Sequence, residues 1–317
     1  MSYVLDLRPP VPDAVRDVAL ERLDRAIGEL SGERSPDVAT AVHEARKDLK
    51  KLRSLVRLLR PGLPRKTYRR EADALREVSR GLGARREADA LVETVDALRD
   101  PAAGRVPATA MDALREAFAD RTSPSSAGDS AGAAVPSAGS GDDFGAPDLS
   151  AAVTALRAVR ERVADGALAV DGRSALAAGL ARSYDRAHEA FAGTAGEPTA
   201  EDLHEWRKRV KDLWYQQRLL APAWPAVLKA AANEARDASK LLGDDHDLAE
   251  LLAVLRDPDG PATRVPADLQ ELPAIVEARR AALLADARAY GARLHAEKPK
   301  AFARRVRRIL DAPPLPG

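Results

Sequence analysis

One short pattern of basic residues occurs twice in this 317-residue chain, and its residue types are those that bind anions. Residues 42–61 read VHEARKDLKKLRSLVRLLRP and residues 203–222 read LHEWRKRVKDLWYQQRLLAP, so ten of the twenty positions are identical. His, Arg and Lys side chains donate hydrogen bonds to phosphate and carboxylate oxygens, and Arg does so with a planar fork. We therefore expect the two copies to form related parts of one anion-binding surface.

Each copy is predicted to form a helix with an apolar face and a cationic stripe, at about 100° per residue. The apolar face comprises Val42, Ala45, Leu49, Leu52, Val56 and Leu59 in the first copy and Leu203, Trp206, Val210, Leu213 and Leu220 in the second. The stripe comprises His43, Arg46, Lys47, Lys50, Arg53 and Arg57 in the first copy and His204, Arg207, Lys208, Lys211 and Arg218 in the second. Like charges one turn apart repel each other, so a stripe of nearly one sign predicts an anionic ligand.

The two stripes are unequal. Trp214 stands where the first copy has Arg53, and Asp212 stands where it has Lys51. We therefore expect residues 43–57 to supply most of the contacts, and residues 204–218 to supply less charge and more aromatic surface. Further basic residues near the repeat are secondary candidates for the same ligand: Arg22, Arg25, Arg80, Arg86, Arg182, Arg186, Lys240, His246 and Arg305.

Helices are predicted throughout, because apolar residues recur at helical spacing and no segment alternates as a strand does. A Ser at position 35 followed by Pro36 predicts that the first basic helix is capped there and runs to Arg60, before Pro61. Residues 122–147, rich in Gly, Ser, Ala and Pro, are predicted to form a flexible insertion. The other helices are expected near residues 13–30, 65–82, 85–99, 107–121, 148–165, 173–192, 199–221, 224–243, 245–256, 266–296 and 300–310.

The repeat divides the chain into two predicted helical halves, 13–165 and 171–311, the first carrying the insertion at 122–147. Short loops favour four-helix packing in each half, and two like units favour a pseudo-twofold arrangement. The fold class is therefore expected to be all-α, with two bundles around a basic cavity.

Composition narrows the class of protein further. Charged residues make up 31% of the chain and the net charge is +1, so the clustering of charge matters more than its total. The absence of cysteine excludes disulfides and thiolate chemistry and favours a cytoplasmic setting. No apolar run is long enough for a signal peptide or a membrane span, so we expect no membrane partner.

Among polyanions, a linear polyphosphate suits a long cationic groove, because it carries about one charge per unit and no bases. A nucleic acid is the alternative, although aromatics are only 4% of the chain and offer few stacking platforms. A metal site is a second alternative, suggested by Asp244, Asp245, His246 and Asp247, although the run fits a helix cap at least as well. A metal-dependent phosphohydrolase is a third, but the sequence does not locate the carboxylate-bound metal that it would need. No phosphate-binding loop or nucleophile motif is present, so we expect no enzyme activity, cofactor or metal.

The sequence VHEARKDLKKLRSLVRLL resembles the histidine-led signature of the CHAD domain, the "conserved histidine α-helical domain". LHEWRKRVKDLWYQQRLL, followed by LLGDDHDLAEL, resembles the second half of that domain. The likeness covers nearly the whole chain except residues 122–147 and short tails. It implies two helical bundles facing a basic cavity, inorganic polyphosphate as the ligand and, in some members, a location on polyphosphate granules. The ExExK motif of catalytic domains fused to some relatives is absent.

Overall fold

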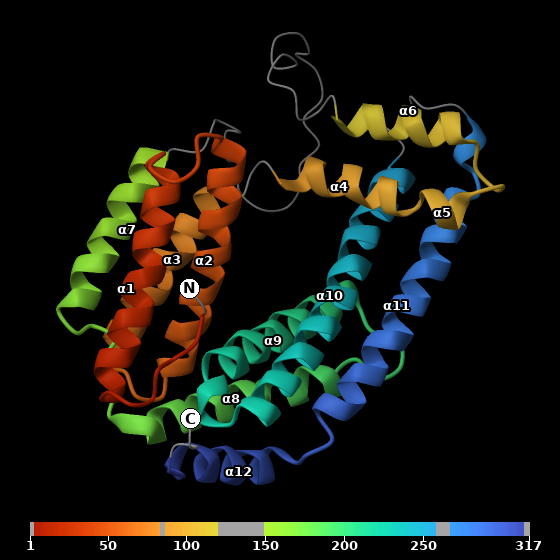
Figure 1. Ribbon diagram of the computed structural model, residues 1–317. Coiled ribbons are helices and arrows are strands. Elements are labelled where there is room, and N and C mark those ends of the chain that lie inside the picture. Colours follow the sequence, from red (N-terminus) through yellow and green to blue (C-terminus); the bar gives the residue numbers. More distant parts are fainter. Residues whose placement is uncertain (1–2, 83–85, 120–148, 258–266, 314–317) are drawn as a thin grey trace. The chain divides into compact units, whose positions relative to one another are not determined.

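The computed structural model describes residues 3–82, 86–119, 149–257 and 267–313, and every regular element in those ranges is a helix (Figure 1). The prediction of an all-α fold is thus confirmed. The elements are α1 (Val11–Leu30), α2 (Val38–Leu59), α3 (Arg65–Gly81), α4 (Arg86–Ala97), α5 (Arg99–Ala102), α6 (Ala108–Ala119), α7 (Leu149–Ala164), α8 (Gly172–Ala192), α9 (Ala200–Leu219), η3 (Ala221–Ala223), α10 (Pro225–Arg256), η5 (Ala267–Leu269), α11 (Leu272–Leu294) and α12 (Pro299–Asp311).

The two repeated helices, α2 and α9, begin at side chains that satisfy their first backbone N–H groups. The carboxylate of Asp37 accepts a hydrogen bond from the backbone N–H of Thr40 at 2.7 Å, so Asp37 caps α2. The predicted cap, Ser35, instead donates its hydroxyl to Glu29 at 2.6 Å. The α9 cap is reciprocal: Thr199 and Asp202 each accept a hydrogen bond from the other's backbone N–H.

The predicted break between residues 243 and 245 is wrong. A single helix, α10, runs from Pro225 to Arg256. A glycine inside a helix costs only about 1 kcal/mol relative to alanine, so a helix of 32 residues tolerates Gly243, although the Asp residues that follow it are weak helix formers.

The chain divides into two compact units. The first comprises Met1–Leu82, Asp148–Leu242 and Asp286–Gly317, and the second comprises Gly83–Pro147 and Gly243–Ala285. Each unit therefore takes segments from both of the predicted halves, 13–165 and 171–311. Residues 122–147 lie outside the described residues, and the pseudo-twofold relation between the halves stays a prediction.

Within the first unit, four helices form a closed bundle. Helix α1 packs against α2 and α7, and α3 packs against the same two helices (Figure 1). Helix α8 packs against α9 and α12. Helix α2 also contacts α8 and α9, so the first copy of the basic helix lies beside the second.

The contact between α2 and α8 depends on a glycine. A Cβ atom at Gly179 of α8 would lie 1.8 Å from the carbonyl oxygen of Leu58 in α2, so only glycine allows this approach of the two helices. The N-terminal segment adds two further links to the repeated helices. The Tyr3 hydroxyl donates to the carbonyl of Lys51 in α2 at 2.9 Å, and the Leu5 N–H donates to the carbonyl of Leu219 in α9 at 2.8 Å.

The second unit contains α4, α5 and α6 with one end each of α10 and α11. Helix α4 packs against α6. Asp245 of α10 accepts a hydrogen bond from Arg280 of α11 at 2.9 Å, which joins those two helices. Among the described helices, none is both long enough and apolar enough to cross a membrane.

Candidate anion-binding site

The faces predicted for the repeated helices agree with the structure. All five residues predicted for the apolar face of the second copy are buried, and so are Ala45, Leu49, Leu52, Val56 and Leu59 of the first, whereas Val42 is half-buried. Helix α2 also buries Leu55 and Leu58, because other helices pack against it from several sides. Its cationic stripe is therefore confined to the narrow strip that these neighbours leave open.

Both copies carry the same ion pair near their N-termini. Lys47 Nζ lies 2.7 Å from Glu44, and Lys208 Nζ lies 2.8 Å from Glu205, at equivalent positions of α2 and α9. The hydrogen bond from Lys47 lowers the pKa of Glu44. Burial alone would raise the pKa of Glu205, but hydrogen bonds from Lys208 and Arg209 lower it overall. The repeated glutamates therefore remain carboxylates and offset part of each stripe.

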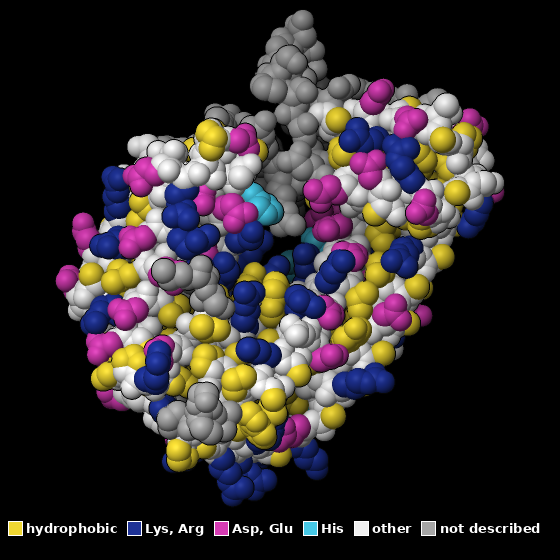
Figure 2. Space-filling view, viewed as in Figure 1, with side chains coloured by type: hydrophobic (Ala, Val, Ile, Leu, Met, Phe, Trp, Pro, Cys, Tyr) yellow, Lys and Arg dark blue, Asp and Glu magenta, His cyan; other side chains and the backbone are white. Residues whose placement is uncertain are grey.

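Five arginines converge where the two copies meet. Together with Tyr68, Ser183 and Asp212 they line a narrow hollow of about 20 Å³ in the first unit. We call them the arginine cluster: Arg57 and Arg60 at the end of α2, Arg182 and Arg186 on α8, and Arg209 on α9. Dark blue Lys and Arg side chains gather in the middle of the visible face, where α2 and α9 lie (Figure 2). The hollow has room for little more than a water molecule, so a larger anion would lie across its mouth.

Asp212 is the acidic side chain among the described residues that line this hollow. It accepts a hydrogen bond from Arg57 Nε at 2.9 Å, which links the two repeated helices. Nearby, the Gln216 side-chain amide donates to the carbonyl of Ser54 at 3.3 Å. Asp212 reduces the positive charge of the second copy, and in the structure it pairs with Arg57 of the first copy.

The arginine cluster carries more positive charge than its acids offset. Burial lowers the pKa of Arg186, and the positive charges of Arg209 and Arg182 lower it further. Burial likewise lowers the pKa of Arg53, with Arg57 and Arg76 adding to the effect. A nearby positive charge disfavours the protonated form of its neighbour. Burial is the larger cause of both shifts, and the neighbouring positive charges add to it; a bound anion would offset those charges.

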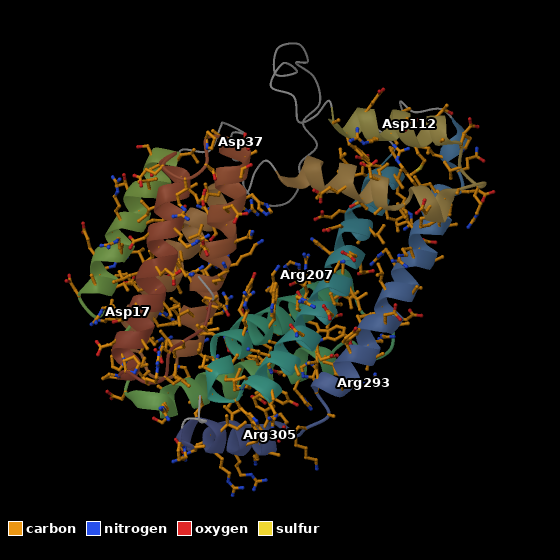
Figure 3. All side chains as sticks on the ribbon, in the orientation of Figure 1. Asp17, Asp37, Asp112, Arg207, Arg293 and Arg305 are labelled. Carbon is orange, nitrogen blue, oxygen red and sulfur yellow. The ribbon has the colours of Figure 1, made fainter. Side chains whose placement is uncertain are left out.

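The rest of the predicted stripe lies on the same two helices. His43 and Arg218 are exposed, and Arg207 projects from α9 in the middle of the view (Figure 3). Arg46 Nη1 donates to the carbonyl of Leu82 at 2.6 Å and so holds the end of α3. Lys50, His204, Arg207 and Lys211 are half-buried.

Two of the secondary candidates form ion pairs with a buried carboxylate of the first bundle. Arg22 is 2% exposed and donates to Asp48 at 3.2 Å and also to Glu21. Arg25 Nε donates to the other oxygen of Asp48 at 3.2 Å. Arg22 is buried and Arg25 is half-buried, and both neutralise the same carboxylate, so these two arginines stabilise the bundle rather than face an external anion.

The other secondary candidates are dispersed. Arg182 and Arg186 belong to the arginine cluster, whereas Arg80 is paired with Glu77 on the exposed side of α3. Lys240 is exposed on α10, and His246 lies in the second unit. Arg305 lines a separate pocket along α12. The side chain of Arg86 lies outside the described residues.

Sequence reasoning missed Arg60, Arg209 and Tyr68. Arg60 ends α2 beside the repeated Pro61, and it lies over the ring of Tyr68, 5.1 Å from the ring centre. Arg209 occupies the position of Asp48 in the first copy, so a comparison of identical positions overlooks it. A search for positions where the copies exchange the sign of their charge would have found it.

A possible set of metal ligands lies in the second unit. The ligand atoms of His246, Asp247 and Glu250 lie within 4.8 Å of one another, and His246 Nε2 is 3.0 Å from Glu250. Such an i,i+4 contact on one helix is an ordinary ion-pair geometry. The prediction that the protein needs no metal stays a prediction.

The fold and the site define an all-α protein in which two copies of a basic helix meet at a cluster of arginines. The family model of the CHAD domain matches residues 17–256, so the chain belongs to the CHAD domain family. The crystal structure of the CHAD domain from the plant Ricinus communis is similar in fold, with a TM-score of 0.56 and 18% sequence identity over 94% of this chain and 96% of that chain. A comparison with curated proteins found no match.

Proposed function

We propose that this protein binds inorganic polyphosphate without changing it chemically. The observation that carries the proposal is the arginine cluster, where five guanidinium groups from the end of α2, from α8 and from α9 line one hollow, and where burial together with the charges of Arg209 and Arg182 lowers the pKa of Arg186. The ligand would lie across the mouth of the hollow and along the stripe of α2 and α9. Membership of the CHAD domain family supports the same ligand, as the resemblance implies.

The composition of the cluster favours a bare phosphate chain over a nucleic acid. Guanidinium groups bind phosphate oxygens in forked, charge-assisted hydrogen bonds. The aromatic ring that lines the hollow, Tyr68, is already covered by the guanidinium of Arg60. A single-stranded nucleic acid needs rings on which its bases can stack. Polyphosphate needs the cations alone.

The same composition argues for binding without catalysis. An arginine stays protonated at neutral pH and so serves poorly as a general base. Tyr68 and Ser183 complete the described lining together with Asp212, which is engaged by Arg57. We therefore propose a binding protein of the cytoplasm that can associate with polyphosphate granules.

The proposal is tested by removing two cations that belong to the cluster and are exposed, Arg60 and Arg182. The Arg60→Ser, Arg182→Ser variant is expected to lose about two phosphate contacts. Its affinity for fluorescent polyphosphate at about 0.1–0.2 M salt should therefore fall about tenfold or more. The slope of log affinity against log salt concentration should fall by about 1–2. Fluorescence anisotropy titrations at several salt concentrations measure both quantities.

The matched control removes two arginines from α1 and α7, Arg16 and Arg157, which lie outside the hollow's lining. The Arg16→Ser, Arg157→Ser variant loses the same formal charge and is expected to keep the wild-type affinity. Equal losses in both variants would mean that net charge alone attracts the ligand, and the site would be rejected. Displacement by DNA or RNA at equal phosphate content would favour the nucleic-acid alternative.

A further inference from the structure

A second pocket in the first unit lies apart from the arginine cluster and shares none of its lining residues. It has a volume of about 690 Å³, which is within the range of small-molecule sites. One wall is the turn that leads into α10, and the other is α12 with the residues that follow it. The lining residues are Ala223, Trp224, Ala301, Arg304, Arg305, Arg308, Ile309, Ala312 and Pro313.

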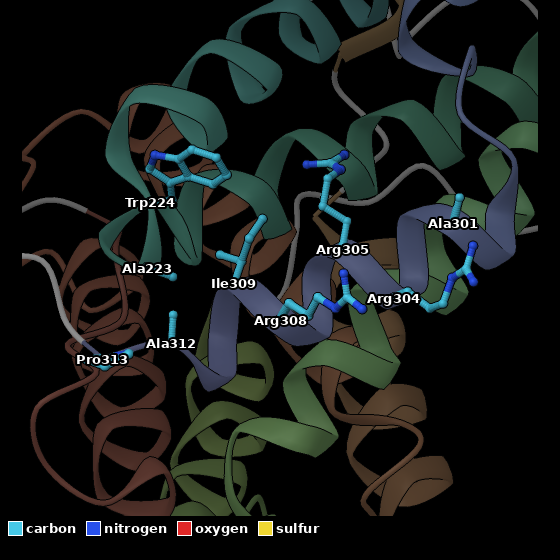
Figure 4. Close-up of a pocket in the computed structure, with 9 residues that line it drawn as sticks. All are labelled: Ala223, Trp224, Ala301, Arg304, Arg305, Arg308, Ile309, Ala312 and Pro313. Carbon is cyan, nitrogen blue, oxygen red and sulfur yellow. The ribbon is translucent and has the colours of Figure 1, made fainter.

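The two ends of this pocket differ in chemistry. Trp224, Ala223, Ala312 and Pro313 gather at one end, near Ile309, and the three arginines follow beyond Ile309 along α12 (Figure 4). Among the described residues that line the pocket, none is acidic. The pocket therefore offers an apolar, aromatic surface beside a concentration of positive charge.

Backbone contacts, rather than burial of the indole ring, fix the position of Trp224. It caps η3, its N–H donates to the carbonyl of Ala221 at 3.2 Å, and Pro225 follows it. The residue before a proline favours an extended backbone, and Trp224 has φ −157° and ψ 85°. Its side chain is left 41% exposed, whereas the other exposed large hydrophobic residue in the described part is Val38. An exposed indole at a pocket is a stacking surface.

The arginines come from one turn of α12, whose apolar residues Phe302, Val306 and Leu310 are buried. Arg305 is held in position by Glu297, to which its Nη2 donates at 2.8 Å, and by the ring of Phe302, 5.1 Å away. Arg304 and Arg308 are exposed and lie one helical turn apart. They present two guanidinium groups on the same side of the helix.

We propose that this pocket binds a nucleoside polyphosphate, with its base on Trp224 and its phosphates on Arg304 and Arg308. A flat ring joined to an anionic chain matches both ends of the pocket at once. An inorganic phosphate chain would use the cationic end and leave the indole without a role. Stacking of a base on an aromatic side chain tolerates different bases, so the class of ligand is defined by ring and phosphates together.

The test is calorimetric titration of the full-length Arg60→Ser, Arg182→Ser variant with ATP, adenosine and inorganic triphosphate, because an intact arginine cluster would itself bind inorganic triphosphate. The wild-type chain is titrated with ATP in parallel. ATP is expected to bind more tightly than either of the other two, because only ATP reaches both ends of the pocket. Trp224→Ala should weaken ATP about tenfold or more while leaving inorganic triphosphate unchanged. Trp224→Phe keeps a flat ring and should retain ATP within a few-fold.

Arg304→Ser combined with Arg308→Ser should weaken ATP about tenfold or more. Arg307→Ser is the matched control on the same helix, since Arg307 lies 3.6 Å from Asp311 and is absent from the lining. ATP binding that survives Trp224→Ala, or that inorganic triphosphate matches in affinity, would overturn the proposal. So would the absence of ATP binding at about millimolar concentration.

The pocket along α12 and the arginine cluster are distinguished by their variants. The Arg60→Ser, Arg182→Ser variant should lose polyphosphate affinity and keep ATP affinity, whereas Trp224→Ala should do the reverse. Loss of ATP binding in the cluster variant would place ATP in the arginine cluster and overturn the second site.

Discussion

Asp48 accepts hydrogen bonds from three cations inside the first bundle. Arg22, Arg25 and Lys51 all donate to its carboxylate, and Arg22 is almost fully buried. Breaking a buried ion pair by removing one partner leaves an uncompensated charge and costs about 3–5 kcal/mol. A carboxylate in this position therefore stabilises the bundle mainly by neutralising Arg22.

Replacing Asp48 with Ala is expected to lower the free energy of unfolding by about 3–5 kcal/mol. Urea unfolding followed by circular dichroism measures the change. Asp13→Ala is the control, because Asp13 pairs with Arg16 at the surface and such pairs contribute about 0–1 kcal/mol. If the two variants unfold at the same urea concentration, the ion pairs of Asp48 contribute no more to the free energy of unfolding than the surface pair of Asp13.

His295 makes the stability of the first unit depend on pH. It is 6% exposed, lies in an aromatic cluster with Tyr184, His188 and Phe191, and neither ring nitrogen has a hydrogen-bond partner within the described chain. Burial lowers its pKa to about 4, and His188 contributes to the shift. The unfolded chain has the ordinary histidine pKa of about 6.5. The neutral form is therefore favoured by folding.

Because the folded pKa lies below the unfolded one, stability is full above about pH 6.5 and is lost as the pH falls toward 4. The loss from this group is on the order of 3 kcal/mol. Urea unfolding at pH 7 and pH 4 should show a larger loss in the wild type than in His295→Phe, which keeps a ring in the cluster but cannot be protonated. If His295→Phe loses as much stability between pH 7 and pH 4 as the wild type, the loss comes from other titratable groups.

At the scale of helices, the crossing of α2 and α8 depends on Gly179. Its Cβ would overlap the backbone of Leu58, which cannot move without disturbing α2. Gly179→Ala is expected to destabilise the protein by about 3 kcal/mol. Gly81→Ala is the matched control, because Gly81 has open space around it and alanine favours the helix. Thermal unfolding of both variants makes the test. A lower midpoint in Gly179→Ala alone indicates the close contact of α2 and α8, whereas a lower midpoint in both variants indicates a general effect of replacing glycine.

Helix positions could be predicted from sequence because local signals determine them. Apolar spacing together with Pro61 predicted α2 and its end, and Thr199 with Asp202 marks the start of α9. The prediction failed at Gly243, where a local helix breaker lies inside a long helix. Local propensity is a weak guide where tertiary packing favours the helix, as at Asp245, which is buried and accepts a hydrogen bond from Arg280 of α11.

At the scale of the molecule, positive charge is concentrated although the net charge is only +1. An anion that binds the folded state alone stabilises it by about 2.7 kcal/mol at a hundredfold excess over the dissociation constant. Polyphosphate is therefore expected to raise the midpoint of thermal unfolding, and about 1 M salt should abolish the rise by screening. Scanning fluorimetry measures both effects, with the Arg60→Ser, Arg182→Ser variant as control. An equal rise in that variant would exclude the arginine cluster as the site.

The candidate site was only partly predictable from sequence. The helical pattern identified Arg57, and the basic residues near the repeat included Arg182 and Arg186, but the sequence could not show that Arg22 is buried against Asp48. The cluster forms because α2, α8 and α9 meet, and that contact is set by packing between residues far apart in the sequence. Arg60 and Arg209 join the site only through this packing.

The hydrogen bond from Arg57 to Asp212 also bears on how a duplicated chain can diverge. Asp212 corresponds to Lys51, and Arg209 corresponds to Asp48, so the two copies exchange the signs of their charges at these positions. If residues 203–222 were an unaltered copy of residues 42–61, Arg57 would face a lysine. This contact between the copies therefore requires that they differ. In an exact duplicate, Arg57 and the lysine opposite it would repel each other, and the two helices would lose this link.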